Sequence, residues 1–169
     1  LYSVIDKSYV FSDDYPCWIL YRDQTFDKTA KKMEFDIFNV FRDRQITKKH
    51  TKNKGKIRVL KSRNIDNVKT INLESYDCYV DEADDFVVSR FLNKENIVAV
   101  PNLTYYPRAT FLPKNTIADG SVALLSQKNG ARKPERDDLK FFSSPEFIYF
   151  YRVARNYGTR SLNIDNNSV

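Results

Sequence analysis

Short runs rich in apolar residues along the middle of the chain predict β-strands. Four such runs lie at 56–60, 76–80, 97–100 and 121–125. Each is four or five residues long, a usual length for a strand and too short for a stable helix. Pro101 directly follows the third run and is expected to end it, because proline cannot donate a hydrogen bond to a strand ladder. The middle of the chain is therefore expected to be rich in strands.

Turn-forming residues precede two of these strands. The tripeptide Asn-Lys-Gly at 53–55 supplies a turn before the first strand. The dipeptide Asp-Gly at 119–120 precedes the last strand and is a strong signal for a β-hairpin. Residues 1–32 mix aromatic and charged side chains, which predicts short strands or irregular structure there.

One segment near the end of the chain predicts a helix. Ser144 is a good N-cap, Pro145 suits the first helical position, and Glu146 places an acid at the positive end of the helix dipole. Gly158 suits the C-terminal cap. Apolar side chains follow at helical spacing along one face, at Phe147, Phe150, Tyr151 and Ala154. Strands in the middle and this helix near the end predict a mixed α/β (α+β) fold.

The composition fits one folded domain. The chain has 169 residues, 41% of them apolar, which is enough to build a core. Cys17 and Cys78 are too few and too far apart for a metal site. A disulfide between them is an open alternative, but reduced buried thiols are expected because nothing indicates secretion. No apolar run is long enough for a membrane helix and no signal peptide is visible, so we expect a cytoplasmic protein without a membrane partner. The chain begins at Leu1 and not at methionine, so we expect a fragment of a longer protein.

Positive charge gathers in one part of the chain. The net charge is +6, and from Arg42 to Arg63 there are ten lysines and arginines with Asp43 as the only acid. Such a stretch repels itself unless an anion lies against it. A basic loop that leads into a strand can hold cations against a phosphate backbone. Nucleic acid is therefore the first partner to expect.

Polar residues of this stretch, together with three arginines further along, are candidate DNA contacts. Arginine can donate two hydrogen bonds to guanine, and glutamine or asparagine can pair with adenine, each discriminating by about 1–3 kcal/mol. Lysine suits phosphate, where charge matters more than position. The candidates for reading bases are Arg42, Arg44, Gln45, Lys61, Arg63, Asn64, Arg108, Arg155 and Arg160, and the candidates for phosphate contact are Lys48, Lys49, Lys52, Lys54 and Lys56.

Each candidate has an alternative role in the fold. The arginines can form structural ion pairs with Asp43 or with the acidic segment 74–85, and the lysines can belong to a solvated loop. Tyr105 and Tyr106 can line a groove or pack in a core, and core packing is expected for at least one of them. His50 has no acid beside it, so a solvent or phosphate contact is expected in place of a general base.

Methyl-transfer chemistry is not expected within this chain. DNA methyltransferases need a glycine-rich turn for their cofactor and, for amino-group methylation, an Asn/Asp/Ser-Pro-Pro-aromatic loop for the target base. No two glycines lie closer than ten residues, and Pro-Pro does not occur. The segment 102–107 lacks the required prolines. A phosphate-binding P-loop is excluded because glycine is scarce. A zinc site is excluded because the chain has two cysteines and one histidine, and no metal is expected.

Several short blocks resemble the target-recognition domains of restriction-modification systems. Such domains occur in the specificity subunits of Type I enzymes and at the C-terminal end of adenine-N6 methyltransferases and fused methyltransferase-endonucleases. The similarity spans 34–169 and leaves 1–33 as an N-terminal extension or linker. The blocks that carry it are Ile46-Thr47-Lys48-Lys49, Gly55-Lys56-Ile57-Arg58-Val59-Leu60, Arg63-Asn64-Ile65, Val100-Pro101-Asn102-Leu103, Pro107-Arg108-Ala109, Asp119-Gly120-Ser121-Val122, Tyr151-Arg152 and Arg160-Ser161-Leu162-Asn163-Ile164-Asp165.

The resemblance implies a mixed α/β domain that reads a short duplex sequence through the major groove. A separate catalytic methyltransferase domain or subunit would then flip the target adenine. S-adenosylmethionine is implied as the cofactor of that parent enzyme, and no cofactor is implied for this chain. The chain departs from Type I specificity subunits because it has a single recognition unit and no long heptad helix after it. A cationic surface is expected where the lysine-rich hairpin meets the final helix.

Three alternatives remain open. The first is a metal-dependent nuclease, because Asp138-Leu139-Lys140 resembles half of a common nuclease signature and Asp119 is a possible distant partner. Asp-x-Lys also occurs often by chance in solvated loops. The second is an RNA-binding module that stacks unpaired bases on tyrosines. The third is a purely structural interaction domain.

Overall fold

A four-stranded antiparallel sheet forms the centre of the molecule. The computed structural model describes residues 4, 6–11, 22–155 and 162–163. The strand order in this sheet is β1-β10-β6-β8, and every neighbouring pair is antiparallel. The bounds of the strands are Phe38–Arg42 for β1, Val122–Gln127 for β10, Val98–Pro101 for β6 and Thr110–Phe111 for β8.

Both faces of this sheet are buried, and alternate residues serve two different cores. In β10, Ala123 and Leu125 contribute to one core, whereas Val122 and Leu124 contribute to the other. Successive side chains of a strand point to opposite faces, which explains this division. A strand buried on both faces is expected to be a continuous apolar run, as the first four residues of β10 are.

Helices cover one face of the central sheet. They are α2 (Gln24–Ala30), α3 (Arg136–Phe141) and α4 (Pro145–Ala154), and a short helix α1 (Lys7–Val10) precedes them. The rings of Phe26 from α2 and Phe150 from α4 stack with centroids 4.6 Å apart. Phe26 is fully buried in this core, so α2, which lies within 1–33, packs with the rest of the fold.

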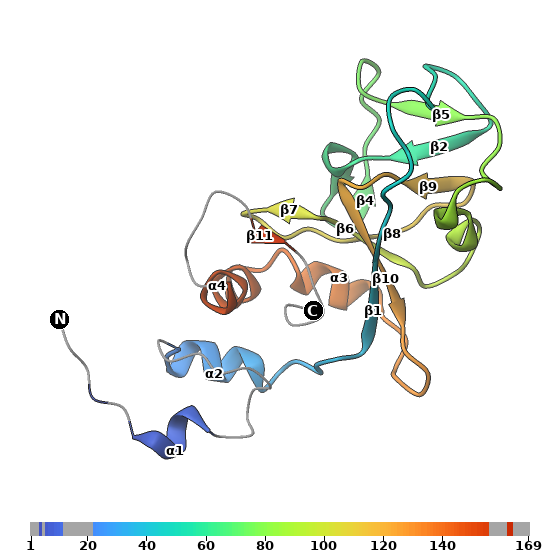
Figure 1. Ribbon diagram of the computed structural model, residues 1–169. Coiled ribbons are helices and arrows are strands. Elements are labelled where there is room, and N and C mark those ends of the chain that lie inside the picture. The colour runs from blue at the N-terminus through green and yellow to red at the C-terminus, as the bar shows by residue number, and fades with distance from the viewer. Residues whose placement is uncertain (1–3, 5, 12–21, 156–161, 164–169) are drawn as a thin grey trace.

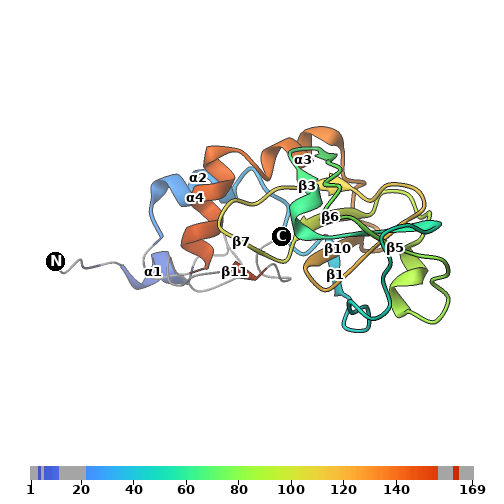
Figure 2. The same ribbon diagram turned by 90° about the horizontal axis from the view of Figure 1, so that it is seen from above.

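Short strands cover the opposite face. A three-stranded sheet has the order β5-β2-β9, in which β2 is antiparallel to β5 and parallel to β9. Figures 1 and 2 show α2 and α4 toward one end of the molecule and β2 and β5 toward the other, with the central sheet between them. The bounds are β2 (Ile57–Leu60), β5 (Cys78–Val80), β9 (Thr116–Ala118), the 3₁₀-helices η1 (Ser62–Asn64) and η2 (Val87–Phe91), and the short pairs β3 (Ile65–Asp66) with β4 (Lys69–Thr70) and β7 (Leu103–Thr104) with β11 (Leu162–Asn163).

The predicted fold class is confirmed, since strands and helices share one mixed α+β structure. The four predicted strands occur as β2, β5, β6 and β10, and the final helix begins as predicted, with the Ser144 hydroxyl accepting from the Phe147 amide at 3.1 Å. β6 ends at Pro101, as predicted, with the proline as the last residue of the strand. The predicted helix cap at Gly158 lies outside the described residues.

The predicted hairpin at Asp119-Gly120 is wrong. The turn itself forms, because the Val122 amide donates to the Asp119 carbonyl at 3.1 Å. The strands on either side belong to different sheets, however: β9 pairs with β2, and β10 pairs with β1 and β6. The turn therefore carries the chain from one sheet to the other. Among the residues that the structure describes, no helix is long and apolar enough to cross a membrane.

Candidate nucleic-acid interface

The lysine-rich segment forms the β1–β2 loop, residues 43–56, and is not a hairpin, because β1 and β2 belong to different sheets. Asp43 begins the loop. The residue is 4% exposed, and Oδ2 accepts from the backbone amides of Gln45 at 2.9 Å and Ile46 at 2.7 Å. Asp43 therefore shapes the loop and does not neutralise its arginine neighbours.

The far end of the loop lies against β5. The backbone groups of Lys52 and Tyr79 exchange two hydrogen bonds of 2.8 Å. A Cβ atom at Gly55 would lie 2.9 Å from Tyr79 Cβ and from the Val80 carbonyl oxygen, so only glycine allows this close approach. Between these anchors, the Thr47 amide donates to Nδ1 of His50 at 3.1 Å. The loop is thus fixed at both ends.

Five cations of this loop are exposed and have no ion-pair or hydrogen-bond partner for their charged groups within the described ranges. Lys52 differs, because its Nζ lies 2.6 Å from Asp81 Oδ2. That hydrogen bond raises the pKa of Lys52 and lowers the pKa of Asp81, so both groups stay charged. The five, which we call the unpaired cations because they form no direct ion pair, are Arg44, Lys48, Lys49, Lys54 and Lys56, of which Lys56 lies near enough to Asp81 to help lower the pKa of that carboxyl.

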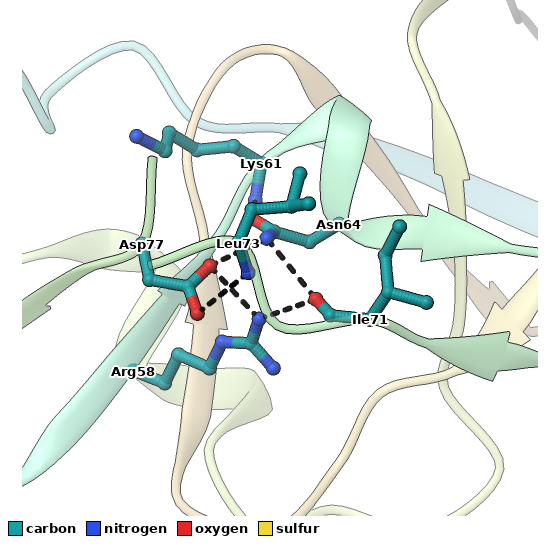
Figure 3. Close-up of polar contacts among 6 residues, drawn as sticks. All are labelled: Arg58, Lys61, Asn64, Ile71, Leu73 and Asp77. Carbon is teal, nitrogen blue, oxygen red and sulfur yellow. Dashed lines mark hydrogen bonds and ion pairs between the residues drawn. The ribbon is translucent and has the colours of Figure 1, made fainter. Parts of the chain in front are cut away.

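The next cation along the chain, Arg58, is half-buried in a polar network. Nη2 of Arg58 donates to Asp77 Oδ1 at 3.1 Å and to the Ile71 carbonyl at 2.7 Å. Nδ2 of Asn64 donates to the same two oxygens, at 2.6 Å and 3.2 Å. The second carboxylate oxygen of Asp77 accepts from the Leu73 amide at 3.2 Å. Figure 3 shows how these contacts tie β2, η1 and the 71–77 segment together.

A hollow of about 390 Å³, which we call the Lys61 groove, lies between the β1–β2 loop and the segment that leads into β5. The Nζ of Lys61 stands 3.8 Å from the ring centroid of Tyr76, and the guanidinium of Arg63 lies 5.4 Å from the same centroid. Donors and acceptors share its lining, which includes Lys48, Thr51, Asn53, Lys61, Tyr76 and Asp119.

Two predicted base readers are held by the fold. Asn64 is fully buried, and its Oδ1 accepts from the Lys61 amide at 3.1 Å, so we remove it from the candidate contacts. Gln45 is exposed, but its Oε1 accepts from the Val87 amide at 2.7 Å and only its NH₂ group remains for a ligand.

The other arginine candidates are dispersed. Nη1 of Arg42 donates to Asn102 Oδ1 at 3.2 Å, beside the start of the loop. Arg108 is half-buried, and its Nε has no partner among the described residues. Arg155 caps the C-terminus of α4, and Arg160 lies outside the described residues.

The surface predicted between the lysine-rich segment and the final helix does not form. The buried face of α4 packs in the core that Phe38 and Val98 share, whereas β2 packs in the core on the other side of the sheet. Arg155 is therefore separated from the β1–β2 loop by the central sheet. The candidate interface is reduced to the loop, η1 and the Lys61 groove.

The acidic segment 74–85 contributes partners to the basic stretch. Asp77 and Asp81 of the acidic segment pair with Arg58 and Lys52 of the basic stretch. The acidic segment thus lies beside the basic one, and part of its charge is neutralised there.

The residues of the nuclease alternative occupy different places. Asp138 accepts from both Nη atoms of Arg132 at 2.6 Å and 2.8 Å, and these hydrogen bonds hold the pKa of Asp138 below its ordinary value. Lys140 pairs with Asp137 at 2.6 Å. Asp119 follows β9 and accepts from the amide and hydroxyl of Ser121. In the described part of the chain, no three His, Cys, Asp or Glu side chains gather closely enough to hold a metal ion.

Both tyrosines of the 105–106 pair are exposed, Tyr105 to 44% and Tyr106 to 65%. The prediction that at least one of them packs in a core is therefore wrong. They lie between β7 and β8, beside Leu103, which is 52% exposed.

Sequence reasoning missed Tyr76 as part of the site. Its contact with Lys61 and Arg63 depends on how the 71–77 segment folds back on η1, and no local pattern signals that contact. Comparison of the sequence with protein-family models and with curated proteins gives no match.

Proposed function

We propose that this protein is a sequence-specific recognition module for double-stranded DNA. The observation that carries the proposal is the set of five unpaired cations on one loop that is anchored at both ends. A cation without a carboxylate partner is free to neutralise a phosphate, and phosphate neutralisation supplies most of the non-specific affinity for DNA. The Lys61 groove beside the loop offers both donors and acceptors, as base edges require.

The resemblance to target-recognition domains extends the proposal to a restriction-modification system. In that setting the chain would hold duplex DNA while a separate catalytic domain or subunit methylates adenine at N6, in the cytoplasm of the cell. The described residues do not fit S-adenosylmethionine. Gly55, Gly120 and Gly130 lie far apart, and Gly55 and Gly120 are each closed off by backbone atoms of a neighbouring segment. The proposal therefore assigns that cofactor to the partner.

A titration of duplex DNA at several salt concentrations tests the proposal. Wild-type affinity should fall steeply with salt, and the double variant Lys48→Ala/Lys49→Ala should reduce the slope of log K against log[salt] by about 1.8, since each phosphate contact contributes about 0.9. Lys140→Ala on α3 is the matched control, because that exposed lysine pairs with Asp137 on the helical side. A wild-type protein that does not bind duplex DNA at low salt would refute the proposal.

RNA binding is the second candidate, and the exposure of Tyr105 and Tyr106 favours it. Exposed rings can stack unpaired bases, and each stacked base contributes about 1–3 kcal/mol. Competition between duplex DNA and single-stranded RNA separates the two candidates. Preferential binding of RNA that is lost in Tyr105→Ala/Tyr106→Ala, but kept in Lys48→Ala/Lys49→Ala, would replace the first proposal by the second.

A further inference from the structure

Tyr76 gathers two cations that come from a different part of the chain. Lys61 is the N-cap residue of η1, and Arg63 lies inside this single 3₁₀ turn. Their charged groups lie 3.8 Å and 5.4 Å from the Tyr76 ring centroid. An ammonium or guanidinium at such a distance is attracted by the electron-rich face of the ring. The ring therefore restrains two side chains that would otherwise sample many rotamers.

The same buried network supports the ring and the two cations. Asp77, next to Tyr76 in the chain, is held by Arg58 and Asn64, while Asn64 also accepts from the Lys61 amide. The Ser62 amide donates to Ser121 Oγ at 3.0 Å and anchors the turn from the other side. In Figure 3 the Lys61 side chain extends away from the network, and only its backbone takes part in it.

Restraint distinguishes these two cations from those of the loop. Phosphate contacts tolerate variation in position, whereas base reading requires a donor at a defined place. A long side chain that is already ordered also loses less conformational freedom when it binds. The unpaired cations, such as Lys48 and Lys49, show no such ordering contact within the described ranges.

The neighbouring groove has the mixed polarity that base edges require. Lys61 supplies a donor, and the Asp119 carboxylate supplies an acceptor on the same lining. A carboxylate repels phosphate but can accept from an exocyclic amine of adenine or cytosine. The lining therefore suits base edges better than a sugar-phosphate backbone.

We infer that Lys61 and Arg63 form the pair that reads bases, and that Tyr76 is the positioning residue that sets their direction. The inference rests on the proposed function, because it concerns the DNA side of that same surface. It assigns specificity to η1 and non-specific affinity to the β1–β2 loop. Tyr76 itself need not touch DNA.

Selection from a pool of random duplexes, followed by sequencing of the bound fraction, tests this inference on the 169-residue chain. The wild type should enrich a motif. Tyr76→Leu should enrich the same motif with lost preference at the base pairs that Lys61 and Arg63 read. A well-placed contact discriminates by roughly 5- to 150-fold, so the loss of preference should fall in that range. The salt dependence of binding should not change, because no phosphate contact is removed.

Two control variants accompany the test. Tyr76→Phe keeps the ring and should keep the whole motif. Tyr149→Leu makes the same exchange on α4, where the Tyr149 hydroxyl donates to Asp23 on the helical side of the sheet, and it should also keep the motif. Arg63→Gln leaves the ring intact and should lose preference at part of the same positions, so the inference stays testable even if Tyr76→Leu fails to fold.

The outcomes separate the two claims. If the wild type enriches a motif that survives Tyr76→Leu and Arg63→Gln unchanged, the inference is wrong and the proposed function stands. If those variants weaken all sequences equally, the two cations contact phosphate and the inference is again wrong. A wild type that enriches no motif overturns the claim of sequence-specific recognition, and the inference with it.

Discussion

Lys52 and Arg58 lie six residues apart, and each pairs with an acid of the segment 74–85. The Lys52–Asp81 pair in the β1–β2 loop is open to solvent, with side chains 66% and 49% exposed. The Arg58–Asp77 pair in the network is 14% and 8% exposed and shares its oxygens with Asn64 and Leu73. The two pairs join the same basic stretch to the same acidic segment, and they differ in how far they are buried.

This difference shows how one basic stretch serves two purposes. Charges that are buried must be matched by partners, because an unmatched buried charge is costly. Those that stay in water form weak pairs or none, and they remain available to a ligand. The network therefore fixes the shape of this side of the molecule, while the β1–β2 loop keeps its charge for a partner.

Removing the acid of the Arg58–Asp77 pair should lower the free energy of unfolding more than any other change proposed here. Asp77→Ala leaves the partly buried Arg58 without its carboxylate, and since breaking a fully buried pair costs about 3–5 kcal/mol, the cost here should lie near the lower end of that range. We expect a loss of that size in the free energy of unfolding measured in urea. Asp81→Ala removes the same charge from the exposed pair and is the matched control, with little change expected. Equal effects of the two variants would show that burial does not distinguish the pairs.

Removing the side-chain amide of Asn64 should have the next largest effect on the free energy of unfolding. Asn64→Ala removes an acceptor for the Lys61 amide and the donor shared by Ile71 and Asp77. Leaving buried polar groups without partners costs about 1–3 kcal/mol, so the free energy of unfolding should fall by that amount. Gln45→Ala removes one exposed acceptor and provides the comparison by the same urea titration. If both variants unfolded at the same urea concentration, Asn64 would have no structural role.

The sequence predicts this fold better than it predicts the site. Short apolar runs and the cap at Ser144 are local signals, so the strands and α4 were predictable. Helix α2 was missed because it has seven residues, too few for a clear helical period, and its stability comes from Phe26 packing on Phe150. The hairpin at Asp119-Gly120 was predicted wrongly because local turn chemistry does not reveal which sheet each strand joins.

The site depends on distant contacts, which explains why the sequence only outlined it. The lysines of the loop were identifiable from charge alone. Whether a given cation is free depends on which acid folds against it, and Arg58 and Lys52 illustrate the two outcomes. The same holds for Asn64, whose burial no neighbouring residue signals. Tyr76 became recognisable only when the chain brought it to η1.

Releasing Lys52 from its ion pair should change the affinity for duplex DNA and its salt dependence. Asp81→Asn removes the carboxylate that holds Lys52 and leaves one more cation on the loop. We expect tighter binding of duplex DNA and a salt slope steeper by up to about 0.9, the contribution of one phosphate contact. Asp138→Asn makes the same exchange on the helical side, where Arg132 keeps its ion pair with Glu34, and should leave binding unchanged. A slope that does not respond to Asp81→Asn would place Lys52 outside the interface.

The pH dependence of the unfolding free energy should show the smallest effect, and it tests the exposed Lys52–Asp81 pair directly. The hydrogen bond from Lys52 lowers the pKa of Asp81 in the folded protein below its unfolded value. A carboxyl with a depressed folded pKa contributes stability above its unfolded pKa of about 3.9, and the contribution disappears as pH falls through the lower folded pKa. The unfolding free energies of wild type and Asp81→Asn should therefore differ by a small constant amount between about pH 5 and pH 7. The two values should converge below about pH 4. Because water screens this pair, the difference should also shrink in high salt. A difference that grows toward low pH would mean that Asp81 is held by burial and not by Lys52, which would remove the distinction between the two pairs.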